Sequence, residues 1–178
     1  SERGNAYFTA AQATRTIKVN PKTHQIPSTI EAEYYTTKSG VNVTRWSNTV
    51  FYLNAWNAND FAEYTINVPQ TGTYEVEIFA ASPGSTKKLK LMQGTTVLKS
   101  ISLKQTPNLT RFLGTKATIT LQQGVQKIKV VGEVGGFNFD NMKITVSVIN
   151  PGDGSGGGDS EGVYQLVNVA TGKYLGAA

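Results

Sequence analysis

The 178-residue sequence contains no cysteine and a single histidine, and each scarcity excludes a kind of chemistry. Without cysteine there is no disulfide, no thiolate nucleophile and no thiolate zinc site. A Ser-His-Asp triad would depend on His24 alone, and a metal site built from several histidines is excluded. His24 lies between Pro21 and Pro27. Because proline fixes φ and donates no backbone hydrogen bond, we interpret this segment as an extended linker that leaves the imidazole exposed.

Charged residues are also scarce, at 16% of the chain against about 25% in a typical domain. No apolar run reaches the roughly 18 residues of a membrane-spanning helix, and no signal-peptide pattern opens the sequence, so we take such a peptide as absent or removed. Thr, Asn, Ser, Gln and Gly supply the polarity, and 8 Tyr and 7 Phe accompany them. This mixture is typical of a secreted β-rich protein. The net charge of +5 permits an acidic partner without requiring one.

Composition divides the chain into four parts. Residues 1–27 hold one alternating, strand-like segment and the proline-containing linker, and we interpret them as the remnant of a preceding domain. Residues 150–162 form a Gly/Ser-rich tether. Residues 163–178 predict a short hairpin, the truncated start of a following domain. Residues 28–149 are therefore predicted to be the folded domain.

This central domain is predicted to be all-β. Polar and apolar residues alternate over residues 74–80, 97–103 and 142–148, and turn-forming residues occupy 69–72 and 93–96. No window shows a sustained helical period of about 3.6 residues. Closely spaced strands without intervening helices predict a β-sandwich jelly roll of two antiparallel sheets, with function on loops or on one exposed sheet face.

Catalysis has one candidate pair of carboxylates. Glu31 and Glu33 would project to the same side of a strand, with Cα atoms roughly 6.5–7 Å apart, a spacing that a glycosidase pair can use. Glycosidases usually take their two carboxylates from opposite sides of a cleft, so we favour a non-catalytic interpretation. Glu75 and Glu77 are interpreted as a solvated strand face, and the lysines of residues 87–90 as a contribution to solubility.

Sugar binding has a richer set of candidates. Residues 44–61 and 135–141 interleave aromatic side chains with asparagine. Aromatic planes suit the C–H face of a pyranose, and amides suit its hydroxyl rim because they both donate and accept. Tyr52, Trp46 and Trp56 are the candidate stacking residues. The same residue types stack single-stranded nucleic acid, but the basic residues are too dispersed to follow phosphates, so we expect no nucleic-acid partner. We assign four other aromatics mainly to the core: Phe51, Phe61, Phe137 and Phe139.

Several of these motifs occur together and in order: "IEAEY" at residues 30–34, "NDFAEYTINVP" at residues 59–69 and "GFNFD" at residues 136–140. Over about residues 28–148 the sequence resembles family 6 carbohydrate-binding modules, and it shares part of the pattern with family 35. The resemblance implies a jelly roll without catalytic activity, attached to a secreted bacterial polysaccharide-degrading enzyme. We expect a monomer. The flanks resemble the end of a bacterial immunoglobulin-like repeat and the start of a ricin-type β-trefoil.

The resemblance also implies two sites. One is a structural Ca²⁺ near Glu31, Glu33 and Asp140; from the residues alone, a cation bound by these oxygens is only a possibility. The other is a loop-end sugar cleft, in which Tyr52 matches the stacking aromatic and Asn138 the hydrogen-bonding amide.

The cleft departs from the family pattern. Leu109 is the nearest match to a second aromatic, and Thr44 or Arg45 falls near the place of a carboxylate that some members carry. Trp56, in a short insertion, could supply the missing ring. A sugar-binding module is the favoured interpretation. If the cleft is inactive, the domain would be a structural spacer. A small β-sandwich lyase or hydrolase is the third and least favoured interpretation. The expected ligands are galactans of the agarose class, β-1,3-glucans or xylans, and the positive charge favours an acidic or sulfated polymer.

Overall fold

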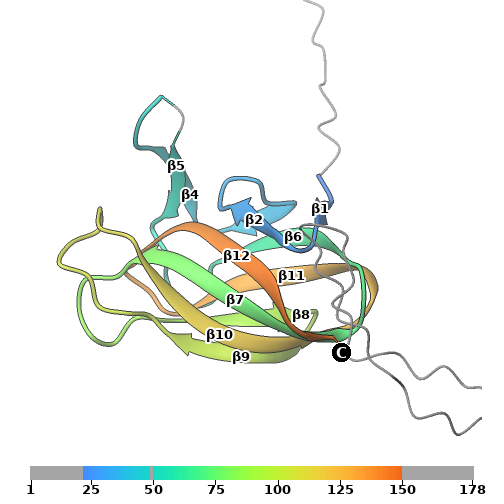
Figure 1. The fold of residues 1–178 in the computed structure, drawn as a ribbon. Coiled ribbons are helices and arrows are strands. Elements are labelled where there is room, and N and C mark those ends of the chain that lie inside the picture. Colours follow the sequence, from blue (N-terminus) through green and yellow to red (C-terminus); the bar gives the residue numbers. More distant parts are fainter. Residues whose placement is uncertain (1–21, 49, 150–178) are drawn as a thin grey trace, which may run out of the picture.

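The computed structural model describes residues 22–48 and 50–149. The strand-like segment before Pro21, the Gly/Ser-rich tether and the terminal hairpin all lie outside the described residues. The described chain forms two layers of β-strands, and Figure 1 shows the β4–β5 hairpin projecting from the body that they make. This part of the chain has no helix long and apolar enough to cross a membrane.

Sheet A runs in the order β1-β6-β11-β8-β9, with β3 also paired to β6. Its strands are β1 (His24–Gln25), β3 (Thr37–Ser39), β6 (Phe61–Val68), β8 (Lys88–Gln93), β9 (Thr96–Ser102) and β11 (Gly124–Val134).

Sheet B runs in the order β10-β7-β12-β5-β4, with β2 also paired to β12. Its strands are β2 (Ser28–Glu31), β4 (Asn42–Arg45), β5 (Phe51–Asn54), β7 (Gly72–Ala81), β10 (Leu113–Leu121) and β12 (Asn138–Ile149). Among the described strands only the β1–β6 pair is parallel. The predicted β-sandwich jelly roll is confirmed, with one parallel pair at the end of sheet A.

The core lies between the sheets and follows the sequence alternation. In β7, Tyr74, Val76 and Ile78 are buried while the residues between them are partly exposed, as the pattern predicts. Each aliphatic side chain buried in this way stabilises the fold by about 1.5–3 kcal/mol. Buried tyrosines keep hydrogen bonds: the Tyr64 hydroxyl donates to the carbonyl oxygen of Ala32 at 2.7 Å. The Tyr74 hydroxyl likewise donates to the carbonyl oxygen of Gln70, so both buried phenols are paired.

The interpretation of His24 as an exposed linker residue is wrong. His24 pairs with Ile66 of β6, its side chain is only 6% exposed, and its Nε2 donates to the carbonyl oxygen of Tyr34 at 3.1 Å. Ile26 is buried too, and its N–H donates to Asn67. The prolines indicated an extended backbone, but an extended backbone can also add a strand to a sheet edge. The packed part of the domain thus begins before residue 28.

The β4–β5 hairpin places the main candidate residues. Its strands pair from Asn42 opposite Asn54 to Arg45 opposite Phe51. β5 joins the rest of sheet B where Leu53, which is buried, lies opposite Phe139 of β12. Successive side chains of a strand alternate between faces. Burial of Leu53 therefore turns Tyr52 away from the core.

Candidate functional site

Three aromatic side chains meet on the hairpin side of the domain. The ring centroids of Trp46 and Tyr52 lie 6.1 Å apart, those of Tyr52 and Phe112 5.7 Å, and those of Trp46 and Phe112 6.1 Å. Trp46 is 48% exposed, and the other two rings are half-buried. We call these three residues the aromatic cluster. Since Trp46 and Tyr52 come from the hairpin and Phe112 from the segment before β10, the cluster is a tertiary feature that presents ring surface to solvent.

A hollow of about 350 Å³ is formed by segments that continue from the same strands. The lining residues, which we call the loop-end pocket, are Ala55, Trp56, Asn57, Leu109, Gly136, Phe137 and Asn138. Residues 55–57 follow β5, residues 136–137 precede β12, and Leu109 lies three positions before Phe112 of the aromatic cluster. The pocket therefore shares two chain segments with the cluster.

Amide groups occur in and beside this pocket. Asn138 is 6% exposed, and its Nδ2 donates to the carbonyl oxygen of Leu109 at 2.7 Å, which ties the 109 loop to the start of β12. At the end of β5, Asn54 buries its Oδ1 without a hydrogen-bond partner. Buried polar atoms are almost always partnered in folded proteins. Asn54 precedes the pocket residue Ala55 in sequence but does not itself line the pocket.

Trp56 is not a surface stacking residue, and the prediction that it supplies a second ring is wrong. Its side chain is 2% exposed and stacks on Phe137 with ring centroids 5.1 Å apart. Its Nε1 donates to the carbonyl oxygen of Leu53 at 3.1 Å. Ala55 adopts a positive φ of 60°, which turns the chain so that the indole enters the core. Trp56 therefore forms the inner wall of the pocket and leaves no free ring face.

The prediction that four phenylalanines lie in the core is correct for two of them. Phe137 and Phe139 are buried, as expected, whereas Phe51 and Phe61 are only half-buried. Leu109 is 42% exposed at the pocket edge and brings no ring. Sequence reasoning missed Phe112. The available signal was its place in the 107–112 segment, where the resemblance led us to look for an aromatic.

Glu31, Glu33 and Asp140 gather where β2 lies against β12. Glu31 lies opposite Asn141, and the Ala32 N–H donates to the Asp140 carbonyl oxygen at 2.8 Å. Burial and then the negative charges of Asp140 and Glu33 raise the pKa of Glu31. Burial also raises the pKa of Asp140, against the opposing effect of a hydrogen bond from Asn141. The three carboxyl groups therefore lie within each other's electrostatic influence.

The carboxyl group of Glu33 is the most unusual member of this acidic group. Burial and the charge of Asp140 raise its pKa, although a backbone hydrogen bond opposes them, and its Oε2 is buried without a partner. Nevertheless, residues 22–48 and 50–149 contain no group of three or more His, Cys, Asp or Glu side chains arranged to hold a metal by themselves. A cation at this position would need backbone oxygens in addition, which is usual for Ca²⁺.

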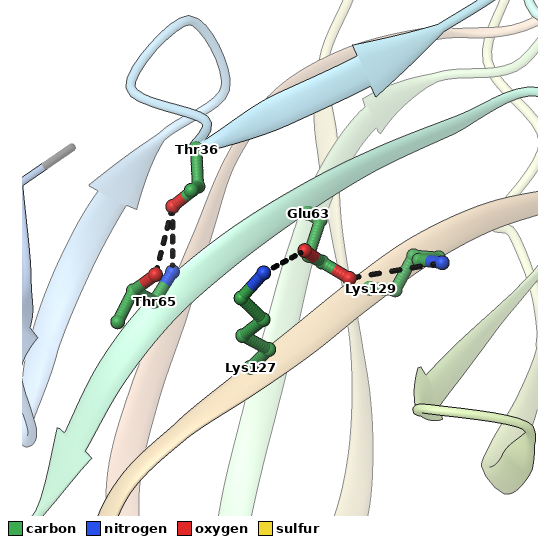
Figure 2. Close-up of polar contacts among 5 residues, drawn as sticks. All are labelled: Thr36, Glu63, Thr65, Lys127 and Lys129. Atoms are coloured by element: carbon green, nitrogen blue, oxygen red, sulfur yellow. Dashed lines mark hydrogen bonds and ion pairs between the residues drawn. The ribbon is translucent and has the colours of Figure 1, made fainter.

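The outer face of sheet A is a second surface with charges and an aromatic ring. Glu63 pairs with Lys127 at 3.0 Å and with Lys129 at 3.7 Å, and the hydroxyls of Thr36 and Thr65 bond to each other beside them (Figure 2). Lys129 also places its ammonium 4.3 Å from the ring centroid of Phe61. Because these groups are engaged with one another, we interpret the face as solvated surface. Glu75 is paired with Lys116 at 2.8 Å in the same way on sheet B.

Comparisons with known proteins agree with the fold. The model of one family, described as carbohydrate binding module (family 6), matches residues 31–146. The fold is similar to a module of Cellvibrio mixtus lichenase 5A solved with cellotriose: TM-score 0.64, 22% identity, 68% of this chain and 98% of that chain. It is also similar to the C-terminal module of the laminarinase LamC from Zobellia galactanivorans, with a TM-score of 0.62 and 25% identity. This match covers 66% of this chain and 98% of that chain.

A third similar structure is a module from Clostridium cellulolyticum solved with xylose: TM-score 0.61, 20% identity, 68% of this chain and 99% of that chain. No curated protein sequence matches the chain. The family match spans more than half of the sequence, and the solved structures are covered almost completely by residues of the described sandwich.

Proposed function

Because the chain belongs to family 6 of the carbohydrate-binding modules, we propose that it binds a polysaccharide through the aromatic cluster and the adjoining loop-end pocket. The module itself is non-catalytic. The observation that carries the proposal is the mutual contact of Trp46, Tyr52 and Phe112 with nearly half of the Trp46 surface open to solvent. Exposed, clustered ring surface of this kind marks interaction sites.

The chemistry of the site suits a sugar. Tyr52 and Trp46 offer ring surface to the C–H face of a pyranose, as expected from the sequence, and Phe112 backs both rings. Asn138 and Asn57, which line the pocket, supply amide groups for hydroxyls. Leu109 contributes apolar contact without stacking. A site this open supports weak binding per sugar chain.

Cellotriose, a β-1,3-glucan and xylose appear in the names of similar structures. These names support β-glucans and xylans as the proposed ligands, and galactans of the agarose class stay among them only from the resemblance in sequence. Tethering by such a module raises the local substrate concentration for an attached enzyme without new chemistry. In this proposal the module belongs to a secreted polysaccharide-degrading enzyme, and the immunoglobulin-like and trefoil segments are its neighbours in the chain.

A structural Ca²⁺ between β2 and β12 is part of the proposal. The donor set fits, because Glu31, Glu33 and Asp140 supply the hard oxygen ligands that Ca²⁺ takes. The buried, unpartnered Oε2 of Glu33 supports a cation there. The pKa of Glu31, raised by burial and then by the charges of Asp140 and Glu33, supports it too. Bound Ca²⁺ would join the first strand of sheet B to the last one.

The test is retention on insoluble polysaccharides such as cellulose, a β-1,3-glucan, xylan and agarose. Wild-type protein should be retained on at least one of them, and Tyr52→Ala and Trp46→Ala should each reduce retention. Tyr34→Ala removes another exposed tyrosine, outside the aromatic cluster, and serves as the matched control. Failure of the wild type to bind any of these polymers would leave the structural spacer as the function. Release of reducing sugar or of unsaturated product would instead show an enzyme.

A further inference from the structure

One lysine of the basic segment 87–90 has a position that solubility does not explain. Lys87 precedes β8 and is half-buried, and its own carbonyl oxygen accepts the N–H of Leu103. Its side chain lies across Gly136, one of the residues that line the loop-end pocket. A Cβ placed on Gly136 would lie 2.8 Å from Nζ of Lys87, 3.2 Å from Cε and 3.8 Å from Cδ. The ammonium and the end of its stem therefore pack against one residue of the pocket lining, while Lys87 itself lies just outside that lining.

Two glycines with left-handed backbone make this position possible. Gly136 has φ +85° and Gly84 has φ +91°, a region that other residues rarely adopt. A Cβ on Gly84 would lie 4.0 Å from Cε of Lys87. The stem of Lys87 thus runs past two residues without side chains, and its ammonium ends beside Gly136, a residue of the pocket lining. A freely solvated lysine needs no such passage.

The charge of Lys87 has no counter-charge on the described part of the chain. Every ion pair there belongs to another lysine: Lys116 with Glu75, and Lys127 and Lys129 with Glu63. None of the residues that line the pocket is acidic. Three carboxylates lie within three positions of that lining, and each accepts a hydrogen bond from another group. Oδ2 of Asp140 accepts from Nδ2 of Asn141 at 2.8 Å, and Oε2 of Glu133 accepts from the hydroxyl of Ser100. Oδ2 of Asp60 accepts the backbone N–H of Asn57 at 2.7 Å and its side-chain Nδ2 at 3.1 Å.

From this geometry we infer that Lys87 is a specificity-determining residue that makes the loop-end pocket prefer anionic sugars. The inference rests on the proposed function, since it assigns a ligand class to the same site. The ammonium pairs with a carboxylate of a uronic acid or with a sulfate ester, while the amides and the aromatic cluster hold the rest of the sugar. Both anions present the oxygen acceptors that an ammonium binds by charge-assisted hydrogen bonds.

The test uses two pairs of polymers that differ only in charge, with affinities measured by calorimetry. One pair is a soluble β-1,4-glucan and the same glucan oxidised to the carboxylate at C6. The other is a sulfated galactan and the same galactan after desulfation. Wild-type protein should bind the anionic member of at least one pair more tightly, and the pair that shows the difference identifies carboxylate or sulfate. The preference should weaken as salt rises, because the pairing is electrostatic.

Three variants separate the pocket charge from the net charge. Lys87→Met keeps the stem and removes the ammonium, and it should weaken binding of the anionic polymer roughly fivefold, as expected for a partly exposed ion pair. Binding of the neutral partner should be unchanged. Lys87→Arg should retain the preference. Lys143→Met removes the same charge from an exposed position on β12 and should leave the preference intact.

Equal binding of both members of each pair by the wild type, or equal effects of Lys87→Met and Lys143→Met, would overturn this inference while leaving the proposed function standing. Absence of binding to all four polymers, together with absence of retention on the insoluble ones, would overturn both. The melting temperature of Lys87→Met shows whether this variant is folded. If it is unfolded, Lys87→Arg is compared with the wild type instead: it should keep the preference for the anionic polymer, and that preference should weaken in the same way as salt rises.

Discussion

Phe112 and Tyr52 lie with their ring centroids 5.7 Å apart, although one precedes β10 and the other belongs to β5. This contact holds the 109–112 segment against the β4–β5 hairpin. Replacing Phe112 by Ala removes a ring that backs both Tyr52 and Trp46. An aromatic pair contributes about 0.5–1.5 kcal/mol beyond its buried area. We therefore expect Phe112→Ala to weaken polysaccharide binding about 3- to 10-fold in calorimetric titrations.

Phe112→Leu is the control for this prediction, since it keeps apolar contact and removes only the aromatic plane. It should fall between wild type and Phe112→Ala. Full affinity in the Ala variant would show that the three rings do not act as one surface.

Trp56 should matter for stability rather than for stacking. Its indole is buried against Phe137 and Phe139, with ring centroids 5.1 and 6.1 Å away. Removing a large buried aromatic costs about 3–5 kcal/mol, so Trp56→Ala should lower the free energy of unfolding by that amount in urea titrations. Trp46→Ala is the matched control, because the same truncation at an exposed indole should leave stability nearly unchanged. A Trp56→Ala protein of wild-type stability would contradict the buried position.

Removal of metal should destabilise the domain. A Ca²⁺ ion that binds only the folded state stabilises it by about 2.7 kcal/mol at a hundredfold excess over its dissociation constant. We expect excess chelator to lower the melting temperature and added Ca²⁺ to restore it. Glu33→Gln should abolish the response to Ca²⁺ and, in chelator, should be at least as stable as wild type because one repelling charge is gone. An unchanged melting curve in chelator, with no metal found by elemental analysis, would remove the ion from the proposal.

Tyr64 should make stability fall at alkaline pH. Its burial, followed by the charge of Glu33, raises its pKa well above the ordinary value of 10.0, so the folded state keeps the phenol proton. The unfolded chain loses that proton above pH 10, which favours unfolding. The contribution of Tyr64 is thus fully present below pH 10 and is lost as pH rises, by up to about 1.36 kcal/mol per pH unit.

Urea titrations from pH 8 to pH 11 measure this slope. Tyr64→Phe loses the hydrogen bond to Ala32, about 1 kcal/mol at neutral pH, but should show a shallower decline above pH 10. Parallel declines in the two proteins would mean that other groups account for the alkaline loss.

The alternation of apolar residues predicted the strands and their buried faces because it is a local property with a period of two. Tyr74, Val76 and Ile78 of β7 are where that pattern places them. His24 was misassigned because proline indicates an extended backbone but not whether that backbone joins a sheet. Trp56 was misassigned because it follows the end of β5, where no periodicity indicates which side of the chain faces inward.

The candidate site could be predicted only in part for a related reason. Tyr52 and Trp46 come from one hairpin, so a local motif was enough to suggest both. Phe112 and Lys87 belong to other segments, and their positions depend on how β10 and β8 meet the rest of the sandwich. The passage of the Lys87 side chain past Gly84 and Gly136 is likewise visible only in three dimensions.

The edge of β12 is divided between two partners. β5 meets it at Phe139, and β2 takes over from Asn141 to Ile144. This edge of β12 is thus paired mainly with β2, while its other edge pairs with β7. The hairpin that carries Trp46 and Tyr52 is anchored through Leu53 and otherwise extends outward (Figure 1). Under the proposed function, recognition and folding therefore depend on different segments of one edge. Exchange of the β4–β5 hairpin for another of equal length, with Leu53 retained, would be a direct way to give this scaffold a new ligand.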